Sequence, residues 1–218
     1  MNNEDDGLLD PKTVWDTAGS LRRGGLALIP TDTVYGLAAS IRQPRAITAL
    51  YYAKGKGESA PLQLLFPPWI QLVMRYASLT DLSRHFIETV GPGGWTAIVP
   101  AKDGWDSPAL AGGRTVGIRI PDAPFVHEVV RALGCPLAAS SANKHGNPSP
   151  RTYEAANKEV GAACAVKIDG GELAGIDSTV IDFASPVPRI LREGAIAHEE
   201  VARILSLDSI EVLRSVRS

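Results

Sequence analysis

Polar side chains follow short apolar runs at several points along this chain. The first group, PTDTVYGL at residues 30–37, comes directly after the run LALI at 26–29. Its hydroxyl groups, on Thr33 and Tyr35, lie just beyond a predicted buried strand. Open α/β sheets bind ligands outside the carboxyl ends of their strands. The block therefore predicts a site for a small polar ligand at a sheet end.

Positively charged side chains occupy comparable positions in AKGKG, GIRIP and ILREG, namely Lys54, Lys56, Arg119 and Arg192. The glycines of AKGKG let backbone N–H groups come close to an anion. Arg119 stands between two isoleucines, so strand alternation points its side chain away from theirs. We expect the two lysines and Arg192 to hold a polyanion, and Arg119 to hold a carboxylate.

Hydroxyl and amide groups gather in the turn-rich segment SSANKHGNPSP, residues 140–150, which contains Ser141, Asn143 and Ser149. Ser178 opens the strand-like STVIDF in the same way. Each segment alone is typical of a capped turn. Together with the cations they predict one pocket, in which Thr33 and Ser178 bind a small hydroxylated group.

Common catalytic signatures are missing from the sequence. It contains no GxxxxGK[ST], GxGxxG, HExxH or GxSxG motif. Its four histidines are scattered, and its two cysteines match no zinc, redox or disulfide spacing. A triad or a metal-centred mechanism is not supported, and we expect no protein metal site.

Composition describes an ordinary globular protein of 218 residues, with 44% hydrophobic residues and a formal net charge of −2. Such a charge supplies no general attraction to nucleic acid or anionic membrane. No apolar run approaches the roughly 20 residues of a membrane span. The absence of an export signal and the isolated cysteines favour the cytoplasm.

Hydrophobic periodicity predicts helices alternating with short strands. Several strand pairs have connections too short for a helical crossover, which favours a mixed α/β sheet with flanking helices. We expect a disordered lead over 1–10, one domain over 11–207 and a tail over 208–218. The predicted helices cover 13–23, 44–53, 67–76, 80–90, 124–133, 152–160 and 198–205; the predicted strands cover 26–29, 37–41, 62–66, 96–99, 115–120, 137–140, 165–168, 179–183 and 189–191.

In order and spacing, these motifs resemble the YrdC-like threonylcarbamoyl-AMP synthases over roughly residues 13–205: PTDTVYGL, AKGKG with PL, GPGGWT, GIRIP, SSAN with NPSP, DSTVIDF and ILREG. The resemblance implies a single-domain twisted open sheet with a concave basic cavity. It also implies condensation of L-threonine, bicarbonate and ATP to threonylcarbamoyl-AMP and pyrophosphate. A downstream tRNA threonylcarbamoyl transferase complex would consume the product.

By motif position, the resemblance assigns threonine binding to Thr33, Tyr35, Arg119 and Ser178. It assigns ATP binding to Lys54, Lys56, Thr96, Ser141, Asn143, Ser149 and Arg192. Lys54, Lys56 and Arg119 would be catalytic, acting by positioning and charge stabilisation. Mg²⁺ would be held by phosphates and waters rather than by a protein cage.

Three departures from the family pattern fall in one loop. Its KxR motif reads Lys54-Gly55-Lys56, a common asparagine is Ala60, and a common histidine is Leu65. Two other functions stay open at this point. One is a double-stranded RNA-binding module, and the other is a carbamoyl-adenylate-forming protein of hydrogenase maturation. A synthase that also contacts RNA weakly stays open as well.

Overall fold

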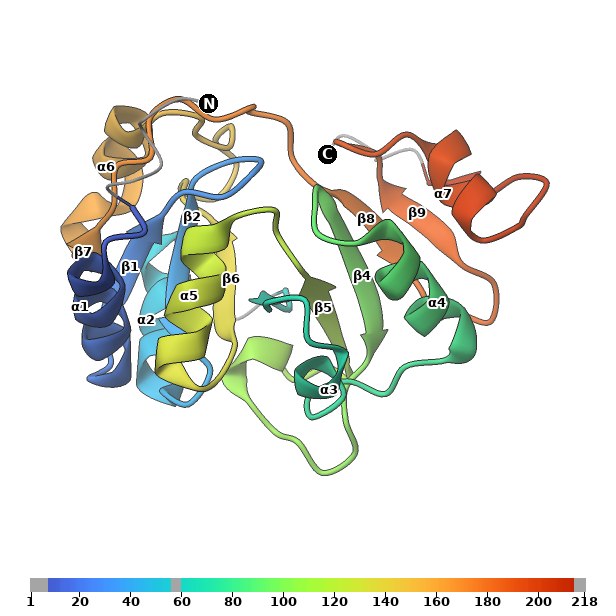
Figure 1. Ribbon diagram of the computed structural model, residues 1–218, viewed down its shortest axis with the longest axis horizontal. Coiled ribbons are helices and arrows are strands. Elements are labelled where there is room, and N and C mark those ends of the chain that lie inside the picture. The colour runs from blue at the N-terminus through green and yellow to red at the C-terminus, as the bar shows by residue number, and fades with distance from the viewer. Residues whose placement is uncertain (1–7, 56–59, 214–218) are drawn as a thin grey trace.

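A computed structural model describes residues 8–55 and 60–213 of the chain (Figure 1). Within these residues, ten strands form one mixed sheet in the order β10-β9-β8-β4-β5-β3-β6-β2-β1-β7. The helices are α1 (Pro11–Arg22), α2 (Pro44–Ala53), α3 (Ile70–Val73), α4 (Asp81–Val90), α5 (Pro124–Leu133), α6 (Tyr153–Val160) and α7 (His198–Ile204). The strands are β1 (Leu26–Ile29), β2 (Gly36–Ser40), β3 (Gln63–Leu65), β4 (Trp95–Pro100), β5 (Thr115–Arg119), β6 (Leu137–Ser141), β7 (Cys164–Lys167), β8 (Thr179–Asp182), β9 (Arg189–Arg192) and β10 (Glu211–Val212).

The predicted mixed α/β sheet with flanking helices is confirmed, and most elements lie within two residues of their predicted bounds. The helix expected over 67–76 is the main difference, because only Ile70–Val73 is α-helical. Pro67 and Pro68 lie in a bend before it, in which Trp69 N donates to Pro67 O at 2.6 Å. A proline ring disfavours helical geometry in the residue that precedes it. Within the expected tail, β10 pairs with β9 and extends the sheet. Of the expected lead, Asp10 caps α1 by accepting from Thr13 N at 3.0 Å, and residues 1–7 lie outside the described residues.

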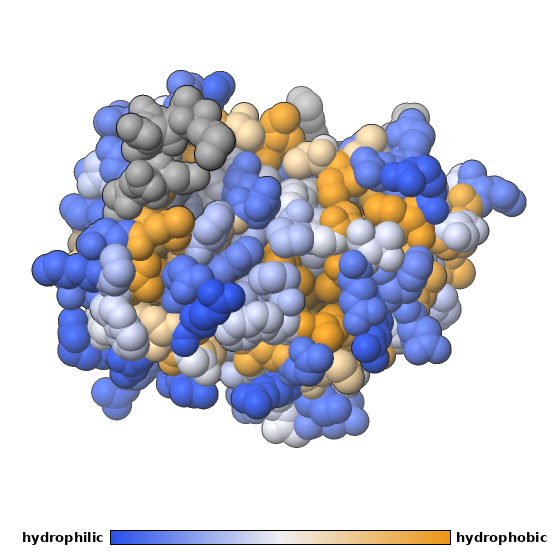
Figure 2. All heavy atoms as spheres, viewed as in Figure 1, coloured by the Kyte–Doolittle hydropathy of each residue, from blue (hydrophilic) through white to orange (hydrophobic). Residues whose placement is uncertain are grey.

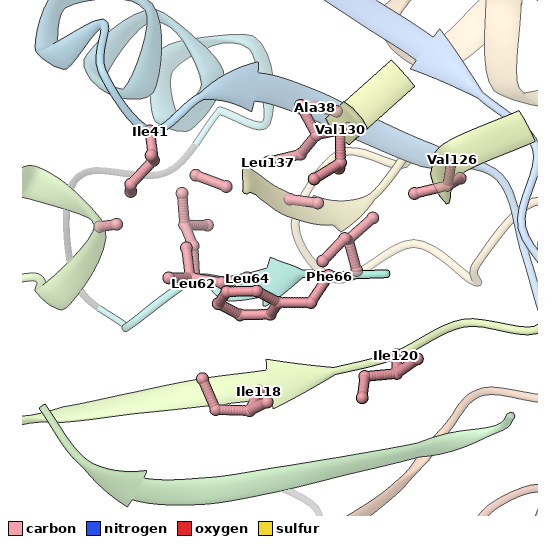
Figure 3. Close-up of a cluster of buried hydrophobic side chains, with 14 of the residues drawn as sticks. Ala38, Ile41, Leu62, Leu64, Phe66, Ile118, Ile120, Val126, Val130 and Leu137 are labelled. Atoms are coloured by element: carbon pink, nitrogen blue, oxygen red, sulfur yellow. The ribbon is translucent and has the colours of Figure 1, made fainter. Parts of the chain in front are cut away.

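Strand alternation gives the central strands two different faces. Leu64 of β3 is opposite Ile118 of β5, and Ile118 is in turn opposite Ala97 of β4. All three are completely buried. In Figure 3 Val126 and Val130 of α5 gather with this apolar face. Along each strand, the residues next to these three therefore point to the other face of the sheet, which carries the polar side chains described below.

Helices α5 (Figure 3) and α4 pack on the apolar face of the sheet. Helix α1 packs against α5, and α4 packs against β4. The Phe86 ring of α4 lies 5.7 Å from the Trp95 ring of β4 and 5.4 Å from the Phe183 ring. Trp95 donates its ring N–H to Gly91 O at 2.7 Å, which fixes the start of β4. This packing sets the position of Thr96, the next residue along β4.

Outer surfaces mix polar and apolar side chains, as Figure 2 shows for the face in view. In the described part of the chain, none of the helices is both long enough and apolar enough to cross a membrane.

The cap of α4 offers a test of how this helix is held. Thr80 Oγ1 accepts from Ser83 N at 3.2 Å, so Thr80→Ala should lower the free energy of unfolding by about 1 kcal/mol. Thr89→Ala, on the exposed side of the same helix, is the matched control and should be neutral or slightly stabilising. Urea denaturation measures both, and equal losses in the two variants would contradict the cap.

Candidate functional site

A cavity of about 240 Å³ lies on the polar face of the central strands. The strands β6, β3, β5, β4 and β8 are neighbours in the sheet, and each contributes a residue to its floor. The lining comprises Val34, Pro61, Leu62, Gln63, Thr96, Ile98, Gly117, Arg119, Ala139, Ser140, Ser141, Asp177, Ser178, Val180 and Arg192. The cavity thus collects the ends of segments that are far apart in sequence.

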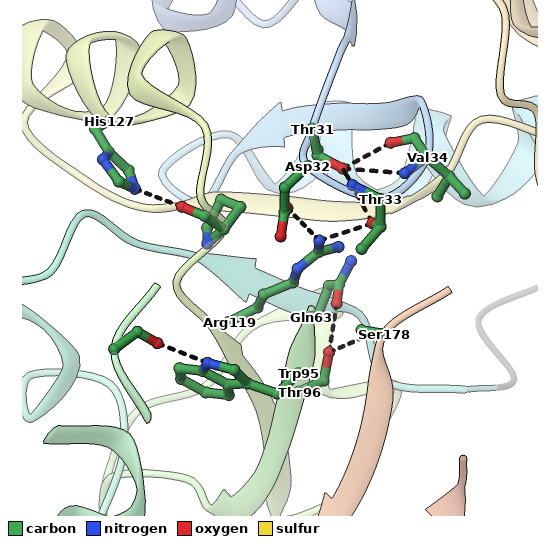
Figure 4. A network of polar contacts seen from close by, with 12 residues as sticks. Thr31, Asp32, Thr33, Val34, Gln63, Trp95, Thr96, Arg119, His127 and Ser178 are labelled. Carbon is green, nitrogen blue, oxygen red and sulfur yellow. Dashed lines mark hydrogen bonds and ion pairs between the residues drawn. The ribbon is translucent and has the colours of Figure 1, made fainter. Parts of the chain in front are cut away.

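Arg119 provides the buried positive charge of this cavity. Its side chain is turned away from Ile118, as predicted, and the residue is only 2% exposed. Arg119 Nη2 donates to Asp32 Oδ1 at 2.5 Å and to Thr33 Oγ1 at 2.7 Å (Figure 4). Burial lowers the pKa of Arg119 from its ordinary value, and the Asp32 carboxylate acts in the opposite direction. Its Nε is buried with no hydrogen-bond partner among the described residues.

The turn after β1 is built to hold Asp32 and Thr33 against this arginine. Thr31 Oγ1 donates to Val34 O at 2.7 Å and accepts from Val34 N at 3.3 Å, which closes the turn locally. Gly175 N donates to Thr33 O at 2.8 Å and ties the turn to the segment before β8. The turn is therefore a rigid support for the arginine.

Tyr35, in the same turn, points elsewhere. Its hydroxyl donates to Gly171 O at 2.8 Å and accepts from Gly170 N at 2.9 Å. Burial, the largest cause, raises the pKa of Tyr35 to about 12. Tyr35 is absent from the cavity lining, so in this structure its hydroxyl ties the turn to the segment after β7.

A row of polar side chains crosses the cavity floor. Ser178 Oγ lies 2.9 Å from Thr96 Oγ1, and Thr96 Oγ1 donates to Gln63 Oε1 at 3.0 Å. Arg192 binds the end of the row, because its Nη2 donates to Ser178 O at 2.8 Å and to Ser178 Oγ at 3.3 Å. Asp177 lies 3.7 Å from the Arg192 guanidinium. Figure 4 shows this row beside Arg119 and Thr33.

A second cavity of about 170 Å³ adjoins the first and shares Pro61, Leu62, Ser140 and Ser141 with it. Lys54, at the end of α2, lies in its wall and is 8% exposed. Its ammonium donates to Ser141 O at 2.5 Å, to Asn143 O at 2.7 Å and to Asn143 Oδ1 at 3.3 Å. Lys54 therefore sets the shape of the loop after β6 and places a positive charge beneath it.

The structure brings most of the sequence-predicted residues together. The larger cavity is lined by Thr96, Arg119, Ser141, Ser178 and Arg192, and the smaller one by Lys54, Ser141 and Asn143. Thr33 supports Arg119 from behind. Tyr35 and Ser149 line neither cavity. Lys56 lies outside the described residues.

Sequence reasoning missed three residues of this site. Asp32 is the ion-pair partner of Arg119, Asp177 is that of Arg192, and Gln63 joins the floor. Each is adjacent to a predicted motif residue or to the PL pair at 61–62. Alternation with the apolar Leu62 and Leu64 could have indicated that Gln63 points to the polar face.

Carboxylates are sparse around the cavities. Asp177 is the single carboxylate in the described lining of either one. Away from them, Glu193, His198 and Glu199 form the one described group with ligand atoms close enough for a metal ion. Glu193 Oε1 is 2.7 Å from His198 Nδ1, so these groups already satisfy one another. The site as a whole suits an anionic ligand with several oxygen acceptors.

Comparison with known proteins finds related sequences and structures. A sequence model of the Sua5/YciO/YrdC family, described as telomere recombination, matches residues 19–194. The threonylcarbamoyl-AMP synthase of Bacillus subtilis is 33% identical over 90% of this chain and 57% of its own. A Mycobacterium tuberculosis protein named "Putative threonylcarbamoyl-AMP synthase" is 35% identical over 88% of both chains.

Among solved structures, Pyrococcus abyssi Sua5 complexed with L-threonine superposes with a TM-score of 0.86 at 28% identity. The match covers 95% of this chain and 62% of that one, so this chain spans less than two thirds of the Pyrococcus abyssi protein. Family match, sequence identity and shared fold agree. The chain therefore belongs to the Sua5/YciO/YrdC family.

Proposed function

We propose that this protein is an L-threonylcarbamoyladenylate synthase, a nucleotidyltransferase that uses L-threonine, bicarbonate and ATP. The observation that carries the proposal is the buried Arg119, held by Asp32 and Thr33 at a cavity that adjoins a second one lined by Lys54 and Asn143. A carboxylate site beside a polyanion site is what joining an amino acid to a nucleotide requires. The names of the relatives supply the substrates.

On the amino-acid side, Arg119 binds the threonine carboxylate. A guanidinium presents a planar set of donors that matches a carboxylate in two-point contact. Its hydrogen bonds to Asp32 and Thr33 both come from Nη2, which leaves donor capacity elsewhere on the guanidinium for such an acceptor. Ser178, on the cavity floor, is assigned to the polar atoms of threonine, and Thr33 holds the arginine in place. Tyr35 acts on this side through the turn that it anchors.

On the nucleotide side, Arg192 and the loop after β6 surround the phosphates. Arg192 lines the larger cavity, and Ser141 borders both cavities. Lys54 contributes charge and fixes the carbonyls of Ser141 and Asn143. Thr96, Ser149 and Lys56 complete the nucleotide assignment by motif position. Mg²⁺ fits a site with one lining carboxylate if phosphates and waters supply its other ligands, and it would neutralise phosphate charge.

The reaction joins the two sides without a covalent enzyme intermediate. The threonine amine attacks bicarbonate, forms a carbamate and releases water. A carbamate oxygen then attacks the α-phosphorus of ATP, and the bond from that phosphorus to pyrophosphate breaks. Arg119, Lys54 and Lys56 act by holding the reactants and stabilising charge, which suits a site without a triad.

The product is a reactive mixed anhydride, which a second enzyme must consume. We assign that step to a tRNA threonylcarbamoyl transferase complex in the cytoplasm, with direct RNA contact by this chain at most weak. The formal charge of −2 is unsuited to RNA binding as the main role.

Substrate dependence tests the proposal directly. Purified protein with ATP, Mg²⁺ and bicarbonate should release pyrophosphate only after L-threonine is added, because the carbamate nucleophile forms from its amine. A coupled pyrophosphate assay measures this, with L-serine and omission of bicarbonate as controls. Release without threonine would overturn the assignment.

The same assay separates the alternatives. A carbamoyl-adenylate-forming protein should release pyrophosphate with carbamoyl phosphate in place of threonine. An RNA-binding module should retain double-stranded RNA at moderate salt and show no dependence on threonine. Either outcome would replace the proposed function.

Exchange of the buried arginine tests the division of the site. Arg119→Lys keeps a positive charge for Asp32 but loses the planar grip, so the KM for threonine should rise about tenfold or more while the KM for ATP changes little. Arg45→Lys, at an exposed position on α2, is the matched control. Steady-state kinetics with each substrate varied in turn gives the result. A rise confined to ATP would mean that the two sides are assigned wrongly.

A further inference from the structure

We propose that Gln63 binds substrate, with its side-chain amide nitrogen donating a hydrogen bond to a carboxylate oxygen of threonine beside Arg119. This inference rests on the proposed function and adds a specificity-determining residue to it. Gln63 lines the larger cavity and is the polar residue of β3, whose other members are Leu64 and Leu65.

A glycine on the neighbouring strand allows Gln63 to take part in the polar row. Gly117 of β5 is opposite Gln63 of β3, and β5 lies between β3 and β4. A Cβ on Gly117 would lie 3.2 Å from Thr96 Cγ2 and 3.3 Å from both Cα and Cβ of Gln63. Those separations are tight, so a side chain there would crowd the two residues that meet above it. Without one, Thr96 reaches across β5 to the amide of Gln63.

The directions of the hydrogen bonds in the row follow from two contacts, that of Arg192 with Ser178 and that of Thr96 with Gln63. Arg192 can only donate, so Ser178 Oγ accepts from it at 3.3 Å. Thr96 uses its one hydroxyl hydrogen on Gln63 Oε1, so the Ser178 hydroxyl donates to Thr96. Gln63 Oε1 is therefore an acceptor that is already occupied. The Gln63 amide nitrogen remains as a donor, and it has no hydrogen-bond partner in the described part of the chain.

Donors that face one cavity can be satisfied together by a single acceptor between them. In Figure 4 the amide nitrogen of Gln63 points toward Arg119 and Thr33, away from Thr96. Arg119 also has donor capacity left at the end of its guanidinium, because its hydrogen bonds to Asp32 and Thr33 both come from Nη2. Two neighbouring groups that can only donate cannot satisfy each other, whereas a carboxylate has acceptor sites for both. We therefore place the threonine carboxylate between Arg119 and Gln63.

Two substitutions distinguish this contact from a structural role. Gln63→Glu keeps an acceptor for Thr96 but replaces the donor with a carboxylate oxygen that repels the ligand. Gln63→Met loses the bond to Thr96 and the donor together but introduces no charge. If Gln63 contacts the carboxylate, Gln63→Glu should weaken L-threonine binding by at least about tenfold, and by more than Gln63→Met does. If Gln63 only supports Thr96, which is assigned to the nucleotide, Gln63→Met should weaken ATP binding and Gln63→Glu should leave L-threonine binding unchanged. That result would overturn the proposal.

Isothermal titration with L-threonine, and separately with ATP, gives both affinities for each variant. Gln71→Glu, at an exposed position on α3, is the matched control for the added charge and should leave both affinities unchanged. Thermal unfolding identifies any variant that fails to fold. In that case the L-threonine affinity of the other Gln63 variant is compared with that of Gln71→Glu. Wild-type protein that does not bind threonine would refute the proposed function itself. If the wild-type protein binds L-threonine and Gln63→Glu binds it with the same affinity as Gln71→Glu, this inference alone would be refuted.

Discussion

A buried guanidinium constrains the whole site. Arg119 is 2% exposed, and a charge in that position needs a charged or strongly polar partner. Asp32 and Thr33 provide it, and removal of one member of such a pair typically costs about 3–5 kcal/mol. The pair also joins the turn after β1 to β5, which are separated in the sheet by β2, β6 and β3. It therefore supports the geometry of the cavity as well as its charge.

Alternation along the strands divides the work between the two faces of the sheet. Leu64, Ile118 and Ala97 build the core, while their sequence neighbours Gln63, Arg119 and Thr96 reach the cavity. A shift of one residue in any of these pairings would exchange the two sets. Packing on the apolar face thus determines where the polar groups point. The site is precise because the core behind it is closely packed.

Much of the fold could be predicted from local pattern. Proline at the start and glycine at the end define α5 in both sequence and structure, and PTDTVYGL, GIRIP and ILREG do lead to one cavity. What could not be predicted depends on contacts distant in sequence. The position of Tyr35 in a polar motif suggests a ligand contact. In the structure its hydroxyl is hydrogen-bonded to the backbone of Gly170 and Gly171.

Other differences have the same origin. Strand β10 is too short to be recognised by alternation, and it exists because β9 offers an open edge. Gln63 carries no motif signal, because its role depends on Gly117 and Thr96 of two other strands. Lys54 was predicted from its charge, whereas its contacts to the carbonyls of Ser141 and Asn143 required the three-dimensional arrangement.

We propose that one continuous site holds an amino acid at Arg119 and a nucleotide at the loop after β6. A crystal structure of the protein with L-threonine and a non-hydrolysable ATP analogue tests it most directly. The threonine carboxylate should lie within hydrogen-bond distance of Arg119, and the phosphates should lie between Arg192 and the 141–143 loop. A threonine bound away from Arg119, or a nucleotide bound outside both cavities, would contradict it.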